Sequence, residues 1–87
     1  MWFVYILRCI DGSLYIGETN DVDQRLLKHN EGSASGFTAK RRPVVLVYSE
    51  LFPTRGAALK RERQLKGWTR AKKDALIASD ATLLKRL

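Results

Sequence analysis

Two segments rich in β-branched and aromatic residues, 2–9 and 14–18, flank the pair Asp11-Gly12 near the start of this 87-residue chain. An Asp-Gly pair between two such runs is a strong signal for a β-hairpin. The sequence therefore predicts two antiparallel strands at the start of the fold, with a tyrosine on each.

The length of the hairpin loop decides whether Tyr5 and Tyr15 share a face of the sheet. A two-residue loop at Asp11-Gly12 would place the two tyrosines on opposite faces. A three-residue loop, with Gly12 in the left-handed conformation, would pair Tyr5 with Gly17 and leave open space opposite Tyr5. Both tyrosines would then lie on one face. The local sequence is compatible with either loop.

A helix is predicted after the hairpin, within TNDVDQRLLKHNEG. Asn20 is the expected N-cap, and Gly32 lies just beyond the expected end. The apolar stripe of this helix continues into His29, and Arg25, four residues earlier, borders the same stripe. A cation and an imidazole are therefore expected side by side at the edge of the buried face.

The rest of the chain contains a loop, a strand and two helices. GSASGFTAKRRP has the composition of a surface loop, and VVLVY is typical of a third, central strand. Thr54 or a neighbouring residue is expected to begin the first helix, which Gly67 ends, and Thr69 is the expected N-cap of the second. The length predicts one domain, with a core over 1–80 and a short C-terminal tail over 81–87.

The helix that follows Thr54 carries a carboxylate where an apolar residue is expected. At about 100° per residue its inward stripe consists of Ala58, Glu62 and Leu65. A carboxylate in that position is costly unless a positive or hydrogen-bonding group meets it. An ion pair with Lys66, four residues further on, is the simple explanation. A functional site that uses the charge is the alternative.

Positive charge is concentrated in the last third of the chain. The net charge is +7, from 16 Lys and Arg against nine Asp and Glu. Residues 1–53 hold six basic and six acidic groups, so the ten basic and three acidic groups of 54–87 carry the whole excess. A basic segment attracts a polyanion, most often nucleic acid, although a solvated helical face has the same composition.

Other classes of protein are excluded by composition. The single cysteine, Cys9, excludes an internal disulfide framework and a multi-cysteine zinc site. No apolar run approaches the roughly 20 residues of a membrane span, and the N-terminus lacks the features of a signal peptide. We therefore expect a cytoplasmic protein without a membrane partner.

A tyrosine pair on a hairpin, an Arg-x-x-x-His helix and a lone inward glutamate resemble, in that order, the GIY-YIG nuclease family. FVY at residues 3–5 stands where the family writes GIY, and YIG at residues 15–17 matches outright. GETNDVDQRLLKH resembles the segment after YIG, and AALKRERQLKGW resembles the helix that bears the metal-binding glutamate. The match covers nearly the whole chain, as in small stand-alone bacterial members. Phe3 replaces the glycine of the first motif, and the asparagine that often follows the family's glutamate has no counterpart.

The resemblance implies an α+β fold in which a small three-stranded antiparallel sheet is flanked by about three helices. It favours the three-residue hairpin loop, because the family brings both tyrosines into one site. It also implies a divalent-metal-dependent endonuclease that hydrolyses phosphodiester bonds in nucleic acid. We expect the substrate to be DNA, recognised by structure with little sequence specificity, in repair, recombination or nucleic-acid turnover.

The resemblance assigns a role to each of five residues. Tyr5 is the expected general base or water-positioning group, with its pKa lowered by the charges of Arg25 and His29. Tyr15 orients the water or the phosphate, Arg25 holds the scissile phosphate, and His29 exchanges a proton with Tyr5. Glu62 binds one Mg²⁺ or Mn²⁺, chiefly when substrate is present. Taken singly, these residues also fit plain structural roles: core tyrosines, an ion pair within the helix, and a histidine at a helix C-terminus.

Basic side chains outside this set are expected to contact backbone phosphates. They are Lys40, Arg41, Arg42, Arg61, Lys66, Arg70, Lys72 and Lys73. The sequence is also compatible with two functions other than an active endonuclease. The missing asparagine favours a catalytically weak or inactive nucleic-acid-binding module, and the lack of an added DNA-binding domain favours a subunit of a larger nuclease complex that is targeted by a protein partner.

Overall fold

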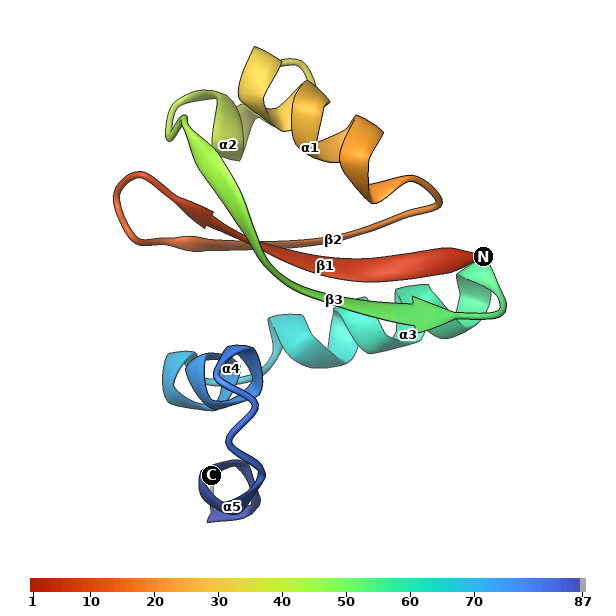
Figure 1. Cartoon of the computed structure of the whole chain (residues 1–87), viewed down its shortest axis with the longest axis vertical. Helices are drawn as coiled ribbons and strands as arrows, with labels where there is room; N and C mark the ends of the chain where they lie inside the picture. Colours follow the sequence, from red (N-terminus) through yellow and green to blue (C-terminus); the bar gives the residue numbers. More distant parts are fainter. Residues whose placement is uncertain (87) are drawn as a thin grey trace.

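A three-stranded antiparallel sheet forms the middle layer of the fold, with the strand order β2-β1-β3 (Figure 1). The computed structural model describes residues 1–86. Its strands are β1 (Trp2–Cys9), β2 (Leu14–Thr19) and β3 (Val44–Phe52). Helices α1 (Val22–Glu31) and α2 (Gly36–Ala39) cover one side, and α3 (Arg55–Lys66) and α4 (Arg70–Ile77) cover the other, with α5 (Ala81–Arg86) beyond α4. The predicted α+β fold class is confirmed.

The hairpin has the three-residue loop. Tyr5 pairs with Gly17 and Leu7 with Tyr15 across the two strands. Gly12 has φ 86°, and its N–H donates to the Cys9 carbonyl at 2.9 Å. Because side chains alternate along a strand, this register places both tyrosines on the same face of the sheet.

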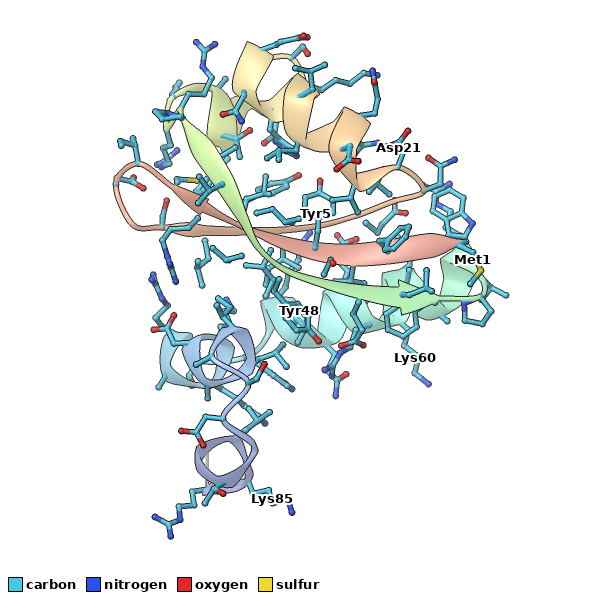
Figure 2. The ribbon with its side chains drawn as sticks, in the orientation of Figure 1. Met1, Tyr5, Asp21, Tyr48, Lys60 and Lys85 are labelled. Carbon is cyan, nitrogen blue, oxygen red and sulfur yellow. The ribbon has the colours of Figure 1, made fainter. Side chains whose placement is uncertain are left out.

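Each face of the sheet carries its own hydrophobic core. Towards α3 and α4, a fully buried cluster includes Val4, Ile6 and Leu65. Towards α1, the cluster contains Tyr5, Leu7, Cys9 and Val44. The predicted hairpin is thus buried on both sides, and Tyr5 lies in the layer between the sheet and α1 (Figure 2).

Most of the predicted helix ends are confirmed. Thr54 and Thr69 cap α3 and α4, each accepting a backbone N–H with its side chain. Gly32, with φ 83°, ends α1. The predicted N-cap of α1 was wrong by one residue: the carboxylate of Asp21, which accepts the N–H of Gln24 at 3.0 Å, caps the helix in place of Asn20.

The third strand lies at an edge of the sheet, and the prediction of a central strand was wrong. Its apolar run suggested burial on both sides, yet Val45 is 54% exposed and Leu46 is 38% exposed. The central position belongs to β1, which pairs with both other strands. Two hydrogen bonds from α1 fix the first residue of β3. The Asn30 side chain accepts the Val44 N–H at 2.8 Å and donates to the Val44 carbonyl at 3.1 Å.

Two short helices lie outside the three that the sequence predicted. The expected surface loop before β3 contains α2, which Ser35 caps by accepting the N–H of Phe37. The expected C-terminal tail contains α5, and Leu87 lies outside the described residues. Across residues 1–86, every helix is too short or too polar to span a bilayer.

Candidate active site

A buried hydrogen-bond chain joins β1, α1 and α2. The Tyr5 hydroxyl lies 2.9 Å from His29 Nε2, and His29 Nδ1 lies 2.7 Å from Thr38 Oγ1. Tyr5 is 1% exposed, and His29 and Thr38 are fully buried. The histidine that the helix pattern placed at the edge of the buried face is therefore inside the fold.

The chain of hydrogen bonds fixes the direction of each proton. The Thr38 hydroxyl donates to the Ser35 carbonyl at 3.3 Å. It must then accept from His29, so Nδ1 carries the proton and Nε2 is the acceptor. The Tyr5 hydroxyl consequently donates to Nε2. This tautomer leaves the imidazole ready to accept a proton from the phenol.

Tyr15 and Gly17 shape the space around the phenol. The Tyr15 ring lies 4.8 Å from the His29 ring and 6.4 Å from the Tyr5 ring, centroid to centroid. A β-carbon on Gly17 would come within 2.6 Å of Tyr5 Cζ. The glycine opposite Tyr5 is thus required by the position of the phenol. The three residues form one compact cluster with the histidine.

The pKa of Tyr5 moves in the direction opposite to the prediction. Burial raises the pKa of this phenol strongly, and the neighbouring Tyr15 adds to the rise. The charge and hydrogen bond of Arg25 oppose the rise without cancelling it. We expected Arg25 and His29 to lower the pKa together. The prediction was wrong because burial dominates and because His29 is neutral.

The histidine is neutral for two physical reasons. Burial lowers the pKa of His29, and the positive charge of Arg25 lowers it further. Both Arg25 and His29 come from α1, four residues apart, as the sequence predicted. The site therefore holds a protonated phenol that donates to a neutral imidazole, with one guanidinium as its permanent positive charge.

Glu62 approaches this cluster from α3. Its negative charge is near enough to contribute to the raised pKa of Tyr5. The side chain is 16% exposed, and Oε1 accepts a hydrogen bond from Lys66 Nζ at 2.7 Å. The predicted ion pair is present, and the second oxygen has no hydrogen-bond partner within residues 1–86. One oxygen of Glu62 therefore forms the ion pair with Lys66, and the other is available to a ligand.

The donor set suits a hard divalent ion that brings its own water. Within residues 1–86, no group of three or more His, Cys, Asp and Glu side chains is arranged to hold a metal ion. Mg²⁺ and Mn²⁺ accept one carboxylate oxygen together with waters and substrate phosphate oxygens. Glu62 offers one such oxygen, and its charge reaches the phenol. The residues present therefore fit an ion that takes most of its ligands from water and substrate.

Some of the predicted phosphate-binding side chains are already bonded within the fold, and others are exposed to solvent. Arg41 and Arg42 are tied to the fold: Arg41 pairs with Asp11 at 3.1 Å, and Arg42 donates to the Ala39 carbonyl at 2.9 Å. Lys40 is exposed on the end of α2.

The basic side chains of α3 and α4 also divide into two groups. Arg61 pairs with Glu50 at 3.2 Å, and Arg70 pairs with Asp74 at 3.0 Å. The Lys72 ammonium lies 4.4 Å from the centre of the Trp68 ring. Trp68 itself packs against the core cluster that contains Leu65. Lys66 and Lys73 face the strand β2 across a groove beside Tyr15.

The sequence reasoning missed Thr38 and Phe37. Both lie on α2, within a segment that we predicted as a loop. Thr38 orients the histidine, and Phe37 lies at the rim of the site with its ring 6.1 Å from the Tyr15 ring. The signal that indicates them is Ser35, a good N-cap residue, followed by the only aromatic residue of that segment.

The family of this small α+β domain follows from its sequence. The model of the GIY-YIG catalytic domain matches residues 1–74. This chain belongs to the GIY-YIG nuclease family.

Bacterial relatives support this assignment over most of the chain. A UPF0213 protein of Staphylococcus aureus is 53% identical over 75 residues, which are 86% of this chain and 92% of that protein. A UPF0213 protein of Staphylococcus saprophyticus is 49% identical over 76 residues, which are 87% of this chain and 93% of that protein.

Two solution NMR structures have the same fold. A UPF0213 protein from Bacillus halodurans is 40% identical with a TM-score of 0.59, and the match covers 94% of this chain and 88% of that one. A protein from E. faecalis is 40% identical with a TM-score of 0.60, and the match covers 88% and 82% of the two chains.

Proposed function

We propose that this protein is a divalent-metal-dependent endonuclease that hydrolyses phosphodiester bonds in DNA. The observation that carries the proposal is the directed hydrogen bond from the Tyr5 hydroxyl to a neutral His29, 2.9 Å long and buried. Arg25, which hydrogen-bonds the same hydroxyl, and Glu62, whose charge reaches it from α3, act on its proton in opposite directions. A proton acceptor, a cation and a metal-binding oxygen each promote hydrolysis of a phosphodiester.

The raised pKa of Tyr5 determines how the proton moves. A phenol that stays protonated cannot accept a second proton. The Tyr5 hydroxyl can act as a general base only in a relay, in which it passes its own proton to His29 Nε2 while its oxygen takes a proton from the attacking water. The phenol is neutral before and after this step, and the positive charge forms on the imidazole. His29 Nδ1–H continues to donate to Thr38 throughout.

The other residues act on the phosphate. Arg25, with its guanidinium beside the phenol, binds the non-bridging oxygens and stabilises the charge that develops on them. Tyr15 borders the same space and positions the water or the phosphate. Glu62 would hold a divalent ion through its second carboxylate oxygen. Such an ion would supply a Lewis acid for the phosphoryl oxygen and would stabilise the leaving oxygen until that oxygen takes a proton from water.

Cleavage of labelled oligonucleotides tests the proposal. The panel consists of single-stranded, duplex, flapped and branched DNA, plus RNA, each with Mg²⁺, with Mn²⁺ and with EDTA. Metal-dependent cleavage of DNA is expected, with a loss of at least a hundredfold in Glu62→Gln. The matched control is Glu31→Gln, an exposed glutamate at the end of α1 that should cleave like the wild type.

Two outcomes would reject the endonuclease. If the wild type binds these oligonucleotides without cleaving any of them, the protein is a nucleic-acid-binding module, as the missing asparagine would favour. If it neither binds nor cleaves them, the basic segment 54–87 does not act on nucleic acid, and a role as a subunit that binds a protein partner is favoured. Binding that weakens steeply with salt is expected only for direct contact with nucleic acid.

A further inference from the structure

A groove lies along the outer edge of β2, directly beside the candidate active site. Its volume is about 230 Å³, and its lining consists of Leu14, Tyr15, Ile16, Phe37, Lys66 and Lys73. The sheet order places β2 at an edge, so α2 and the α3–α4 region border the groove from opposite faces of the sheet. Tyr15 belongs to both places, because its ring also contacts the His29 ring.

The size and lining of the groove suit one flat ring system. Pockets for drug-sized ligands have roughly 300–1,000 Å³, so this groove has room for one part of a larger molecule. It runs over the edge of β2 at Leu14, Tyr15 and Ile16, and the Tyr15 ring is the aromatic part of this lining. Within residues 1–86, no further strand pairs with this edge of β2, so backbone polar groups are available along the groove.

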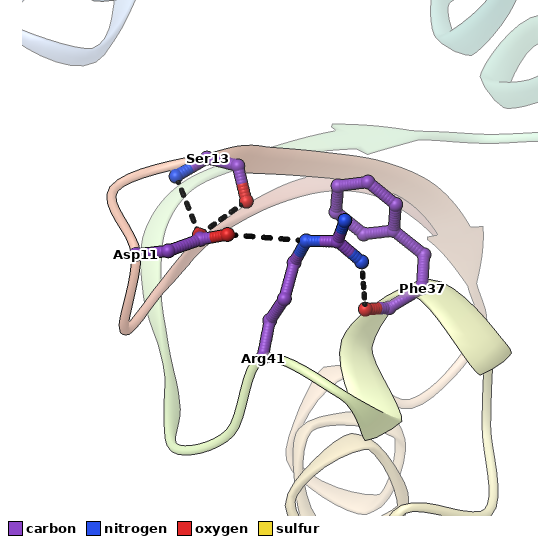
Figure 3. Close-up of polar contacts among 4 residues, drawn as sticks. All are labelled: Asp11, Ser13, Phe37 and Arg41. Atoms are coloured by element: carbon purple, nitrogen blue, oxygen red, sulfur yellow. Dashed lines mark hydrogen bonds and ion pairs between the residues drawn. The ribbon is translucent and has the colours of Figure 1, made fainter.

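An exposed aromatic side chain is held at the rim. Phe37 is 40% exposed, although it stands on a helix of only four residues. The Arg41 guanidinium lies 4.0 Å from the centre of the Phe37 ring, donates to the Phe37 carbonyl at 2.9 Å and pairs with Asp11 (Figure 3). Asp11 in turn accepts hydrogen bonds from Ser13. The ring is thus fixed in place without being buried, which suits contact with a ligand.

The opposite side of the groove is positively charged. Lys66 and Lys73 line it from α3 and α4. Lys66 pairs with Glu62, whereas Lys73 has no ion pair within residues 1–86. An aromatic rim facing two ammonium groups is complementary to a nucleotide, whose base stacks on a ring and whose phosphates attract cations.

We propose that this groove binds one unpaired nucleobase next to the scissile phosphate, so that the preferred substrate is DNA with a single-stranded segment at the cleavage site. The inference rests on the proposed function for the position of the scissile phosphate. A base in duplex DNA is paired and stacked, and it reaches a groove at the protein surface only by leaving the helix. A single strand, a flap or a branch point presents such a base without the cost of breaking a base pair.

Binding in EDTA tests the inference apart from cleavage. Fluorescence anisotropy compares a labelled single strand, the same strand in a duplex, and single strands with an abasic site moved one position at a time. The wild type should bind the single strand at least about tenfold more tightly than the duplex. One abasic position should lose most of that preference, whereas the others should not.

Phe37→Ala should weaken binding of the single strand about tenfold and leave duplex binding unchanged. Phe37→Trp should restore it. Leu27→Ala is the matched control, because Leu27 is an exposed apolar residue on α1, away from the groove lining. Equal affinity for single strand and duplex, or no effect of any abasic position, would overturn the inference with the wild-type protein alone.

The outcomes separate this inference from the proposed function. Selective binding of single strands without cleavage in Mg²⁺ would reject the nuclease and retain the base-binding groove. Cleavage of duplex DNA at the rate of single strands, unchanged in Phe37→Ala, would retain the nuclease and reject the groove.

Discussion

Gly17→Ala should lower the cleavage rate by a steric clash with the Tyr5 side chain. The added β-carbon would lie 2.6 Å from Tyr5 Cζ, and ordinary contact begins at 3.4 Å, so the two atoms must separate by a further 0.8 Å (3.4 minus 2.6). Tyr5 is 1% exposed and is packed in the core beside Leu7, so any such movement disturbs its neighbours and its hydrogen bond to His29. A displacement of about 1 Å at a reacting group costs on the order of a hundredfold in rate.

Single-turnover cleavage, together with circular dichroism and urea unfolding, measures the effect of Gly17→Ala. We expect the rate to fall about a hundredfold and the free energy of unfolding to fall by about 1–3 kcal/mol, from overpacking. Gly56→Ala is the control, because a β-carbon there meets nothing within 4 Å. It should gain about 0.5–1 kcal/mol in α3 and keep the wild-type rate. A folded Gly17→Ala protein that cleaves like the wild type would refute the reasoning.

Further predictions concern the residues that support the site. Thr38→Val should lower kcat about tenfold or more without raising KM, because the hydroxyl selects the His29 tautomer. Thr38→Ser should restore kcat, and steady-state kinetics measures both constants. Asn30→Ala should lower the free energy of unfolding by about 2 kcal/mol, because two hydrogen bonds to Val44 are lost; urea unfolding measures this, and an unchanged value would contradict it. The pKa of His29 is lowered, so below about pH 6.5 the unfolded chain binds a proton that the folded chain does not. The free energy of unfolding should therefore fall as the pH drops from about 6.5 towards the folded-state pKa, and His29→Gln should remove that part of the pH dependence.

The sequence predicted those parts of the site that depend on local periodicity. The stripe of α1 placed Arg25 and His29 together, and the stripe of α3 placed Glu62 inward. The pairing of Tyr5 with Gly17 needed more than local sequence, because two- and three-residue loops were both compatible with it. Only the family resemblance favoured the longer loop.

Features that depend on tertiary packing were outside the reach of the pattern. Thr38 reaches His29 because α2 folds back against α1, nine residues after the histidine. The position of β3 in the sheet depends on which strands pair, and its apolar run led to the wrong prediction of a central strand. The direction of the Tyr5 pKa required a comparison of burial with the charge of Arg25, and burial can be judged only from the packed structure.

The most direct test of the central claim is the single-turnover cleavage rate of Tyr5→Phe. This change removes one oxygen atom, the one 2.9 Å from His29 Nε2, and leaves the ring in its core. Tyr48→Phe is the matched control, because the Tyr48 hydroxyl bonds to Glu50 on the opposite face of the sheet. We predict a loss of at least a hundredfold for Tyr5→Phe and a rate within twofold of the wild type for Tyr48→Phe. A Tyr5→Phe protein that cleaves as fast as the wild type would contradict the role of the phenol.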